Sequence, residues 1–492
     1  MSVSTQEPAA PVESAEPAER GRLDRFFEIT RRGSTVKREV LAGITTFAAM
    51  SYIVVLNPLI IGTAPDKDNN LLGMGPVAGV TCLVAAVMTI MMGVVGRVPF
   101  AVATGLGLNA FVAYAVASQM TWAEAMGLVV IEGLIITVLV LTGFRKAVFR
   151  AIPAPLKAAI AAGIGLFIAM IGLVDGGLVR AGEGVPVQLG ADGTLRGWPT
   201  VIFLVGLLLT GILVARKVKA GILIGIVVTT VAAAIVNAFA KPGGAFLPDG
   251  TPNPGGWRLN VPTLPDPLIK APDLHLLGNV SFSSFAHVGV MTALLLVFTL
   301  VLADFFDVMG TTVGLAKQAG LTNSDGTDMP RLGKVLFVDG VAAVAGGAGN
   351  ASSATTYVES SSGIADGGRT GLTSVVTGVL FLGALLLTPL VSLVPSEAAG
   401  PALVIVGALM IRQVKDIDFT DVGVAVPAFL TMTLMPFTYS ITNGIGAGFV
   451  SWVAIRVAQG KARTIHPLMW AVSAAFVVYF GINLVKAVTG VS

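Results

Sequence analysis

The segment Ala-Thr-Gly-Leu-Gly-Leu-Asn (103–109) interrupts an apolar run that begins at Pro99. A second segment of this kind, Ala-Gly-Gly-Ala-Gly-Asn-Ala-Ser-Ser (345–353), lies in the second half of the chain, just before Glu359. Glycine interruptions at corresponding positions of two halves are the best sequence indication of a transport site at the membrane midplane. Irregular backbone is tolerated there only where it lines a cavity or is buried in protein. The two segments therefore predict a binding site formed by two broken spans.

The composition excludes most other classes of protein. The chain has 492 residues, of which 54% are hydrophobic and 12% are charged, and its mean hydropathy is +0.84. Soluble domains carry about 25% charged residues, so this chain has too little polar surface to dissolve. Disorder, coiled coil and nucleic-acid binding are excluded on the same ground, and the single cysteine, Cys82, excludes a disulfide framework. The chain is predicted to be an all-α polytopic membrane protein.

Runs of about 20 mostly apolar residues each predict a membrane-spanning segment. The sequence contains 14 such segments and a C-terminal fifteenth, whose topology is left open. They lie near residues 40–62, 75–95, 99–118, 122–144, 156–178, 199–215, 220–240, 284–316, 335–349, 352–365, 370–394, 398–411, 420–437, 442–458 and 467–489.

The charges between these segments support the span order. With the N-terminus inside, about 24 of the 31 Lys and Arg residues fall on the cytoplasmic side, as the positive-inside rule requires. A Pro- and Gly-rich segment from Lys241 to Leu277 falls outside, between the seventh and eighth spans. Because seven is odd, two halves of seven spans have opposite orientations, which is the inverted repeat of many secondary transporters. The polar N-terminus is predicted to be a cytoplasmic tail and not a signal peptide.

Four acidic residues stand out within spans, where each costs about 2.5–3.5 kcal/mol on insertion scales. They are Asp304, Asp307, Asp339 and Glu359, and they must face protein or a water-filled cavity. Asp304 and Asp307 are three residues apart, which predicts that they share one helical face. When two carboxylates lie this close together and away from water, their repulsion favours a state in which one of them keeps a proton. A proton-coupled carrier requires such a group. A purely structural hydrogen bond is the alternative for all four, and it is favoured for Asp339.

Other residues near these acids suit a flat heterocyclic ligand. Asn109 supplies an amide, and Phe305 is placed to stack on a ring, although packing is the default role of an apolar residue in a span. A heterocycle with ring nitrogens and exocyclic groups can hydrogen-bond to carboxylates, to an amide and to the free N–H groups of half-helices. No spacing fits a metal, and no glycine-rich loop is followed by Lys-Ser or Lys-Thr. We therefore expect no metal, no cofactor and no ATP-driven transport.

The sequence resembles the nucleobase–cation symporter 2 superfamily, and specifically its AzgA-like branch of adenine/guanine/hypoxanthine permeases. The resemblance runs from about Leu23 to Tyr479 and departs from the family pattern at Asn350-Ala351-Ser352, where the family usually has Gly-Thr-Ser. Five stretches carry it: Arg-Glu-Val-Leu-Ala-Gly-Ile-Thr-Thr-Phe (38–47) with Tyr52 and Asn57-Pro58; Ala-Thr-Gly-Leu-Gly-Leu-Asn-Ala-Phe-Val-Ala-Tyr (103–114); Ala-Asp-Phe-Phe-Asp-Val-Met-Gly-Thr (303–311); Tyr-Val-Glu-Ser-Ser-Ser-Gly (357–363) with Gly-Gly-Arg-Thr-Gly-Leu (367–372); and Met-Pro-Phe-Thr-Tyr-Ser-Ile (435–441).

The resemblance implies 14 spans in two inverted repeats of seven, with short extended breaks in spans 3 and 10. It also implies a core domain of spans 1–4 and 8–11 and a gate domain of spans 5–7 and 12–14. The expected boundaries are residues 1–36 for the cytoplasmic tail, 37–150 and 284–395 for the core domain, 151–240 and 396–460 for the gate domain, 241–283 for the extracytoplasmic loop and 461–492 for a C-terminal hydrophobic segment.

The resemblance further implies a transporter, not an enzyme, that imports adenine, guanine or hypoxanthine by proton symport with alternating access. We expect it in the cell membrane, surrounded by lipid, with a cytoplasmic N-terminus and a homodimer contact through the gate domain. A related carrier for uracil, xanthine or another small solute is the alternative. The predicted substrate-binding residues are Asp304, Glu359, Asn109, Phe305, Thr356 and Tyr357, and those predicted to support the site or couple protons are Asp307 and Asp339.

Overall fold

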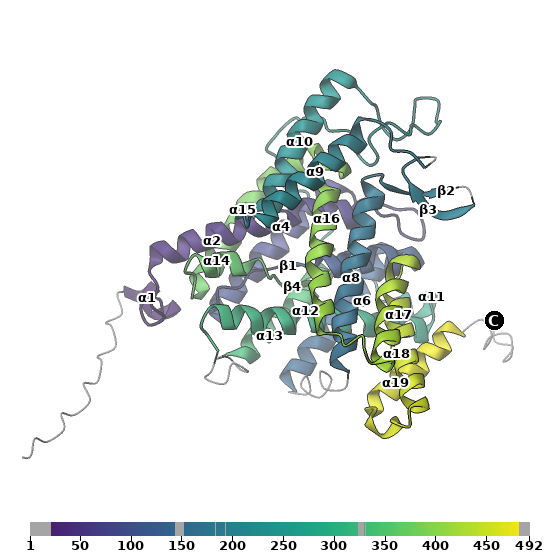
Figure 1. The fold of residues 1–492 in the computed structure, drawn as a ribbon. Helices are drawn as coiled ribbons and strands as arrows, with labels where there is room; N and C mark the ends of the chain where they lie inside the picture. Colours follow the sequence, from purple (N-terminus) through teal and green to yellow (C-terminus); the bar gives the residue numbers. More distant parts are fainter. Residues whose placement is uncertain are drawn as a thin grey trace, which may run out of the picture.

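The structure is a computed structural model that describes residues 21–142, 152–182, 184–191, 193–322, 329 and 331–481. Helices make up most of these residues (Figure 1), which confirms the predicted all-α class. Within the described ranges, nine helical segments are long and apolar enough to cross a membrane. The number of spans, 14, stays a prediction.

The first half of the chain contains nine α-helices and three strands among its described residues. They are α1 (Gly21–Phe27), α2 (Val36–Met50), α3 (Ile53–Ile61), α4 (Met74–Met91), β1 (Val102–Thr104), α5 (Leu106–Phe111), α6 (Trp122–Leu141), α8 (Ala154–Asp175), β2 (Val179–Gly182), β3 (Val185–Leu189), α9 (Trp198–Ala215) and α10 (Gly221–Ala240), with α5 continued by a π-helical turn (Val112–Val116) and a 3-10 turn (Ala117–Gln119).

The second half follows a long irregular segment after α10. Its elements are α11 (Ser284–His287), α12 (Val290–Gln318), α13 (Leu332–Ala348), β4 (Ala354–Thr356), α14 (Ser360–Ala365), α15 (Gly371–Ala384), α16 (Ser396–Met410), α17 (Val422–Phe437), α18 (Ile441–Ala458) and α19 (Pro467–Phe480), with 3-10 segments after α15 (Leu385–Leu393) and α16 (Ile411–Asp416). Helix α19 begins the predicted fifteenth segment, and residues 482–489 of that segment lie outside the described residues.

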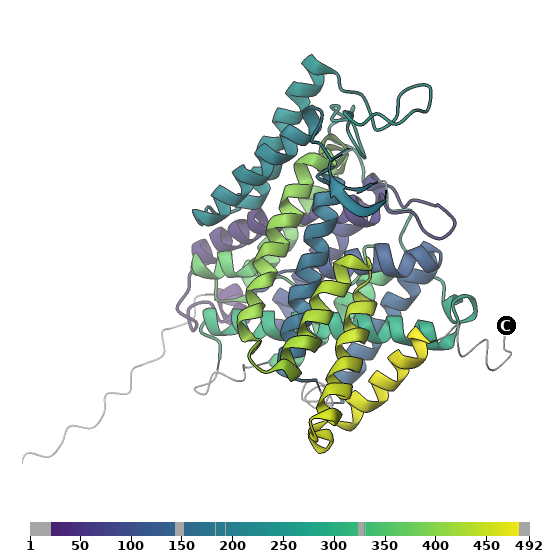
Figure 2. The same cartoon turned by 45° about the vertical axis from the view of Figure 1, so that its right-hand side comes forward.

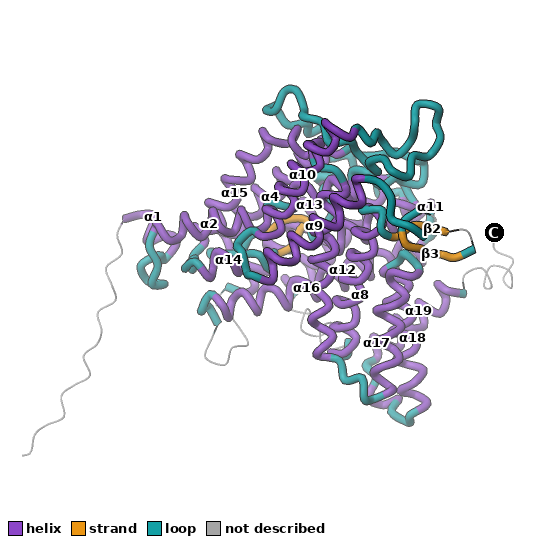
Figure 3. Tube along the Cα trace, turned by 45° about the horizontal axis from the view of Figure 1, so that its top comes forward, coloured by secondary structure: helices purple, strands orange, loops and turns teal. Residues whose placement is uncertain are grey.

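The third and tenth predicted spans are both broken by a short strand, as the glycine-rich segments predict. Strands β1 and β4 pair antiparallel, with Val102 opposite Thr356 and Thr104 opposite Ala354. Figure 3 shows this pair in orange among the helices at the middle of the molecule. Two further backbone bonds extend the pairing, from Gly105 N to Ser353 O (3.0 Å) and from Tyr357 N to Ala101 O (2.9 Å). Each break thus supplies hydrogen-bond partners to the other, as buried backbone requires.

The helices form two packed groups. The first helix group contains α2–α6 and α12–α15, in which α13 packs on α6 and α15 packs on α2 and α4. The second helix group contains α8–α10 and α16–α18, in which α8 packs on α16 and α17. Figure 2 shows α9 and α10 (teal) at one end of the second group and α17 and α18 (yellow-green) at the other. An ion pair joins the groups between Lys219, in the α9–α10 turn, and Asp366, which follows α14.

Glycine permits the close contact between α8 and α16. A Cβ atom added to Gly407 would lie 2.3 Å from the carbonyl oxygen of Gly165, and one added to Gly172 would lie 2.6 Å from that of Gly400. Any side chain at these positions would push the two backbones apart. Small residues are common at such helix crossings in membranes because they let the backbones approach and gain van der Waals contact.

A buried carboxylate joins the start of α2 to the start of α15. Glu39 is fully buried and accepts hydrogen bonds from Arg369 N (3.0 Å), Thr370 N (3.2 Å) and the Thr373 hydroxyl (2.6 Å). The N–H groups at a helix N-terminus have no acceptor inside the helix, and a negative charge there is stabilised by the helix dipole. Glu39 therefore acts as the N-terminal cap of a helix more than 300 residues away in sequence.

We expect Glu39→Ala to destabilise the fold, because two buried N–H groups and one hydroxyl lose their acceptor. The expected loss is on the order of 3 kcal/mol, seen as a lower midpoint in thermal unfolding of the purified protein. Glu39→Gln keeps one acceptor oxygen and should lose less. Equal midpoints for Glu39→Ala and the parent protein would contradict the capping role.

Candidate functional site

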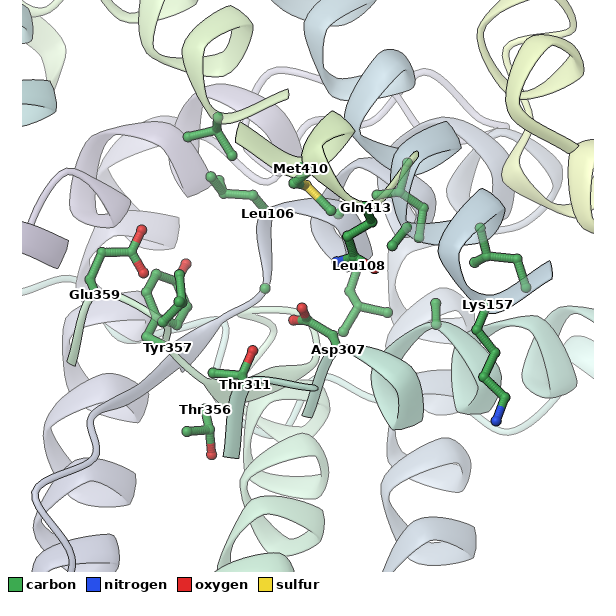
Figure 4. Close-up of a pocket in the computed structure, with 18 of the residues that line it drawn as sticks. Leu106, Leu108, Lys157, Asp307, Thr311, Thr356, Tyr357, Glu359, Met410 and Gln413 are labelled. Atoms are coloured by element: carbon green, nitrogen blue, oxygen red, sulfur yellow. The ribbon is translucent and has the colours of Figure 1, made fainter. Parts of the chain in front are cut away.

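A cavity of about 560 Å³ lies between the two helix groups, beside the paired strands. Its polar wall belongs to the first group and includes Tyr52, Asp307, Thr311, Thr356, Tyr357 and Glu359. Its opposite wall belongs to the second group and is mostly apolar, with Ile160, Ala161, Ile164, Val406 and Met410. Lys157, Gln413 and Asp416 complete the lining on that side. Figure 4 shows Asp307, Tyr357 and Glu359 on one side of this space, with Met410 and Gln413 across from them.

The break in span 10 places Glu359 at the cavity. Glu359 directly precedes α14, three residues after strand β4 ends, so its carboxylate lies at the start of a half-helix. The hydroxyl of Tyr52, a buried side chain at the α2–α3 junction, donates a hydrogen bond to Glu359 Oε1. The Tyr357 hydroxyl donates to the carbonyl oxygen of Thr104 at 2.5 Å, which ties the end of β4 to β1. These bonds fix the carboxylate of Glu359 relative to both strands.

Asp307 supplies the second carboxylate of the cavity. It lies on α12 and, although protein surrounds it, its side chain is exposed to the cavity. Thr311 lies four residues further along α12 and lines the same cavity, as the helical repeat places residues i and i+4 on one face. In Figure 4 the carboxylate of Asp307 points into the space between Tyr357 and Leu108. The cavity therefore has an acidic acceptor from each of two different elements.

Three other carboxyl groups are buried behind the strands and do not line the cavity. Asp304, Asp339 and Glu132 are each at most 1% exposed. Asp339 accepts hydrogen bonds from Thr356 N (2.9 Å) and the Thr356 hydroxyl (2.8 Å). Glu132 accepts one from the Ser353 hydroxyl at 3.1 Å. Within the described part of the chain, neither oxygen of Asp304 accepts a hydrogen bond.

The predicted site residues are therefore divided between two places. Glu359, Thr356, Tyr357 and Asp307 line the cavity. Asn109 and Phe305 are buried and, like Asp304, are not among the lining residues that the structure describes. The amide of Asn109 donates to the Thr104 hydroxyl at 3.4 Å, beside strand β1. Direct contact of Asp304, Asn109 and Phe305 with a ligand stays a prediction.

The sequence-based assignment missed several residues of this region. Tyr52 belongs to a stretch that carries the family resemblance, but its contact with Glu359 joins residues 307 positions apart. Glu132 is an acid within an apolar run, the same signal that identified the other four. The lining residues of the second helix group, such as Met410 and Gln413, carry no charge or glycine pattern that would mark them in the sequence.

The arrangement suits a flat, polar and uncharged molecule that donates hydrogen bonds. Two carboxylates face such a molecule from the first helix group, and an apolar surface faces it from the second. Ligand pockets in general combine an apolar lining with a few placed polar groups that fix orientation. An anion would meet the charges of Asp307 and Glu359 and is disfavoured.

Comparison with known proteins identifies the class. Residues 37–447 match a family described as "Permease family" (Xan_ur_permease). The chain belongs to this permease family, that of the nucleobase–cation symporters 2. This confirms the predicted resemblance and makes the permease a multi-pass membrane transporter.

The relatives of this permease match it over nearly their whole length. It is 38% identical over 460 residues to the guanine/hypoxanthine permease PbuG of Bacillus subtilis, covering 92% of this chain and 98% of the relative. It is 35% identical over 461 residues to the adenine permease AdeP of Escherichia coli, covering 93% of this chain and 95% of the relative.

Solved transporters share the fold of this permease. The transmembrane domain of the cyanobacterial bicarbonate transporter BicA matches with a TM-score of 0.58 at 16% identity, covering 84% of this chain and 97% of that one. The murine anion transporter Slc26a9 in its inward-facing state matches with a TM-score of 0.54 at 12% identity, covering 93% of this chain and 77% of that one. At such low identity the likeness concerns the fold alone.

Because Asp339 holds strand β4 through two hydrogen bonds to Thr356, we expect Asp339→Ala to loosen the paired strands. A buried N–H left without an acceptor costs about 1–3 kcal/mol, so thermal unfolding of the purified permease should begin at a lower temperature. Asp339→Asn keeps an acceptor oxygen and should retain most of the stability. A parent-like midpoint for Asp339→Ala would show that the strand pairing does not depend on this residue.

Proposed function

We propose that this permease imports purine nucleobases, with adenine, guanine and hypoxanthine as candidate substrates, by proton symport. The observation that carries the proposal is the pair of carboxylates, Asp307 and Glu359, facing an apolar wall across one cavity. A neutral purine presents ring and exocyclic N–H donors along its edges and apolar faces above and below its plane. The relatives named as guanine/hypoxanthine and adenine permeases support the same class of substrate.

The position of the cavity supports transport by alternating access. It lies between the two helix groups, which we propose to be the core domain (37–150 and 284–395) and the gate domain (151–240 and 396–460). Its lining includes Lys157, in the first turn of α8, and Gln413 and Asp416, which follow α16. These helix ends are predicted to be cytoplasmic. In this proposal the structure corresponds to the inward-open state, and movement of one group against the other opens the opposite side.

The remaining expectations belong to the same proposal. The permease lies in the cell membrane with its N-terminus in the cytoplasm, and two copies contact each other through the gate domain. The described surface of α9 and α10 is consistent with burial in lipid or against a second copy, because Leu208, Val231 and Phe239 are more than half exposed. A carrier for uracil or xanthine is the runner-up, and competition between bases decides between them.

We expect Glu359→Gln and Asp307→Asn each to weaken purine binding. Losing a hydrogen bond to a charged acceptor costs about 1.5–3 kcal/mol, which corresponds to roughly 10- to 100-fold in the dissociation constant. Uptake of labelled adenine, guanine and hypoxanthine by expressing cells, and calorimetric binding to the purified protein, measure this loss. Asp416→Asn, a change of the same kind at the edge of the lining, is the control and should bind nearly as the parent does.

Cell uptake also tests the class of substrate. An excess of unlabelled purine should displace labelled purine, whereas uracil should not. If no purine competes, or if both cavity variants transport as the parent does, the proposed site is wrong.

Proton symport is tested separately from substrate binding. A protonophore should abolish accumulation above the external concentration while leaving exchange of labelled for unlabelled purine in place. Accumulation should also rise as the external pH is lowered, because the inward proton gradient then grows. Accumulation that persists with the protonophore and follows a sodium gradient would refute proton coupling.

A further inference from the structure

We infer that Glu132, Asp304 and Asp339 form the binding site of the coupled proton, behind strand β4 and apart from the substrate cavity. The inference rests on the proposed proton symport and adds to it Glu132, a residue outside the cavity. Glu132 lies near the middle of α6, Asp304 on α12 and Asp339 on α13. Helix α6 packs against both other helices. The three carboxyl groups lie close enough for the charge of Asp339 to act on both Asp304 and Glu132.

The three groups are connected to three residues of the break in span 10, all within residues 353–356. Ser353 donates to Glu132, and Thr356 donates to Asp339 through both its N–H and its hydroxyl. Thr355, between them, is 1% exposed and interacts with Asp304. The carboxyl groups thus cover one side of the segment 353–356, and the cavity lies on its other side.

The charged groups that act on Asp304 and Glu132 are acidic. Taking a carboxylate out of water costs several kcal/mol unless opposite charge or hydrogen bonds compensate. The charged groups that act most strongly on Asp304 are Asp339, Glu132 and Asp307, and the one that acts on Glu132 is Asp339. All of these are acids, so the surroundings oppose a second negative charge rather than stabilise it.

Unsatisfied oxygen atoms point to a proton as the ligand. Oε2 of Glu132 is buried without a hydrogen bond among the described residues. Asp304 has the Thr355 hydroxyl beside it, but neither of its oxygens makes a hydrogen bond of ordinary distance and angle there. A protonated carboxyl group is a donor as well as an acceptor, so a proton would allow neighbouring groups of this cluster to bond to one another. A metal ion is disfavoured, because the described residues contain no group of three His, Cys, Asp or Glu side chains placed to hold one.

Thr356 connects the cluster to the cavity. Its hydroxyl donates to Asp339 at 2.8 Å, and the residue also lines the cavity. A hydroxyl can accept one hydrogen bond while it donates another, so a proton entering from water in the cavity reaches Asp339 through one side chain. When the cluster loses its proton, repulsion among the carboxylates acts on β4, which carries Thr356, Tyr357 and Glu359 into the cavity.

The test is Glu132→Gln, which retains the acceptor for Ser353 but cannot ionise. We expect purine binding to the purified permease and purine exchange in proteoliposomes to be retained. Accumulation driven by an imposed pH gradient should fall to the level reached without a gradient, and the pH dependence of transport should flatten. Glu124→Gln is the matched control on the same helix. Glu124 accepts hydrogen bonds from Ser283 and Thr121 at the helix start and pairs with His287, all outside the cluster. Its variant should keep gradient-driven accumulation.

Each outcome decides the inference. If Glu132→Gln accumulates purine on a pH gradient as the parent does, Glu132 does not hold the coupled proton. If the folded variant has lost purine binding together with accumulation, Glu132 supports the substrate site, and the inference is overturned. Failure of the proposed function looks different, because the parent protein itself would then show no purine uptake. Should Glu132→Gln fail to fold, Ser353→Ala, which removes the donor to Glu132, must shift the pH dependence of transport without abolishing binding, or the inference fails.

Discussion

The pairing of β1 with β4 is the constraint on which the rest of the structure depends. Two spans lose their helical hydrogen bonds at the same depth, where lipid offers no replacement. The other broken segment supplies donors and acceptors through the register from Val102–Thr356 to Thr104–Ala354. Side chains supply others, such as the Thr89 hydroxyl, which bonds to both N and O of Val102. The two halves of the chain are therefore joined at this pair. The half-helices α5 and α14 begin where the strands end, and the cavity lies beside them.

The strand pair also separates two sets of acidic residues. Asp307 and Glu359 lie on the cavity side, and Glu132, Asp304 and Asp339 lie behind the segment 353–356. An extended segment is thin enough for side chains from both sides to reach the same few residues, whereas a full helix would hold the two sets about 10 Å apart. Thr356 shows this, because it lines the cavity and donates two hydrogen bonds to Asp339.

The sequence predicts the helical class, the two breaks and most acids of the site, because composition, glycine and charge are visible without coordinates. It does not predict the side to which each acid turns. Asp304 and Asp307, three residues apart, were expected to share one face, but residues at that spacing differ by about 60° around a helix. That difference is enough to place Asp307 at the cavity and Asp304 behind the strand. Contacts such as Tyr52–Glu359 join distant residues, and no local pattern reports them.

The proposed separation of substrate and proton sites would have a thermodynamic consequence for symport. Coupling between two ligands is a free energy, and it is reciprocal: whatever purine binding does to proton affinity, proton binding does to purine affinity. If both ligands bound the same carboxylate directly, a protonated acid could no longer accept an N–H from the base, and the two would compete. Placing the proton behind β4 leaves Glu359 and Asp307 free to accept hydrogen bonds while the proton removes repulsion behind the strand. The proposed arrangement would therefore favour cooperative binding of purine and proton, which a symporter needs, over their competition.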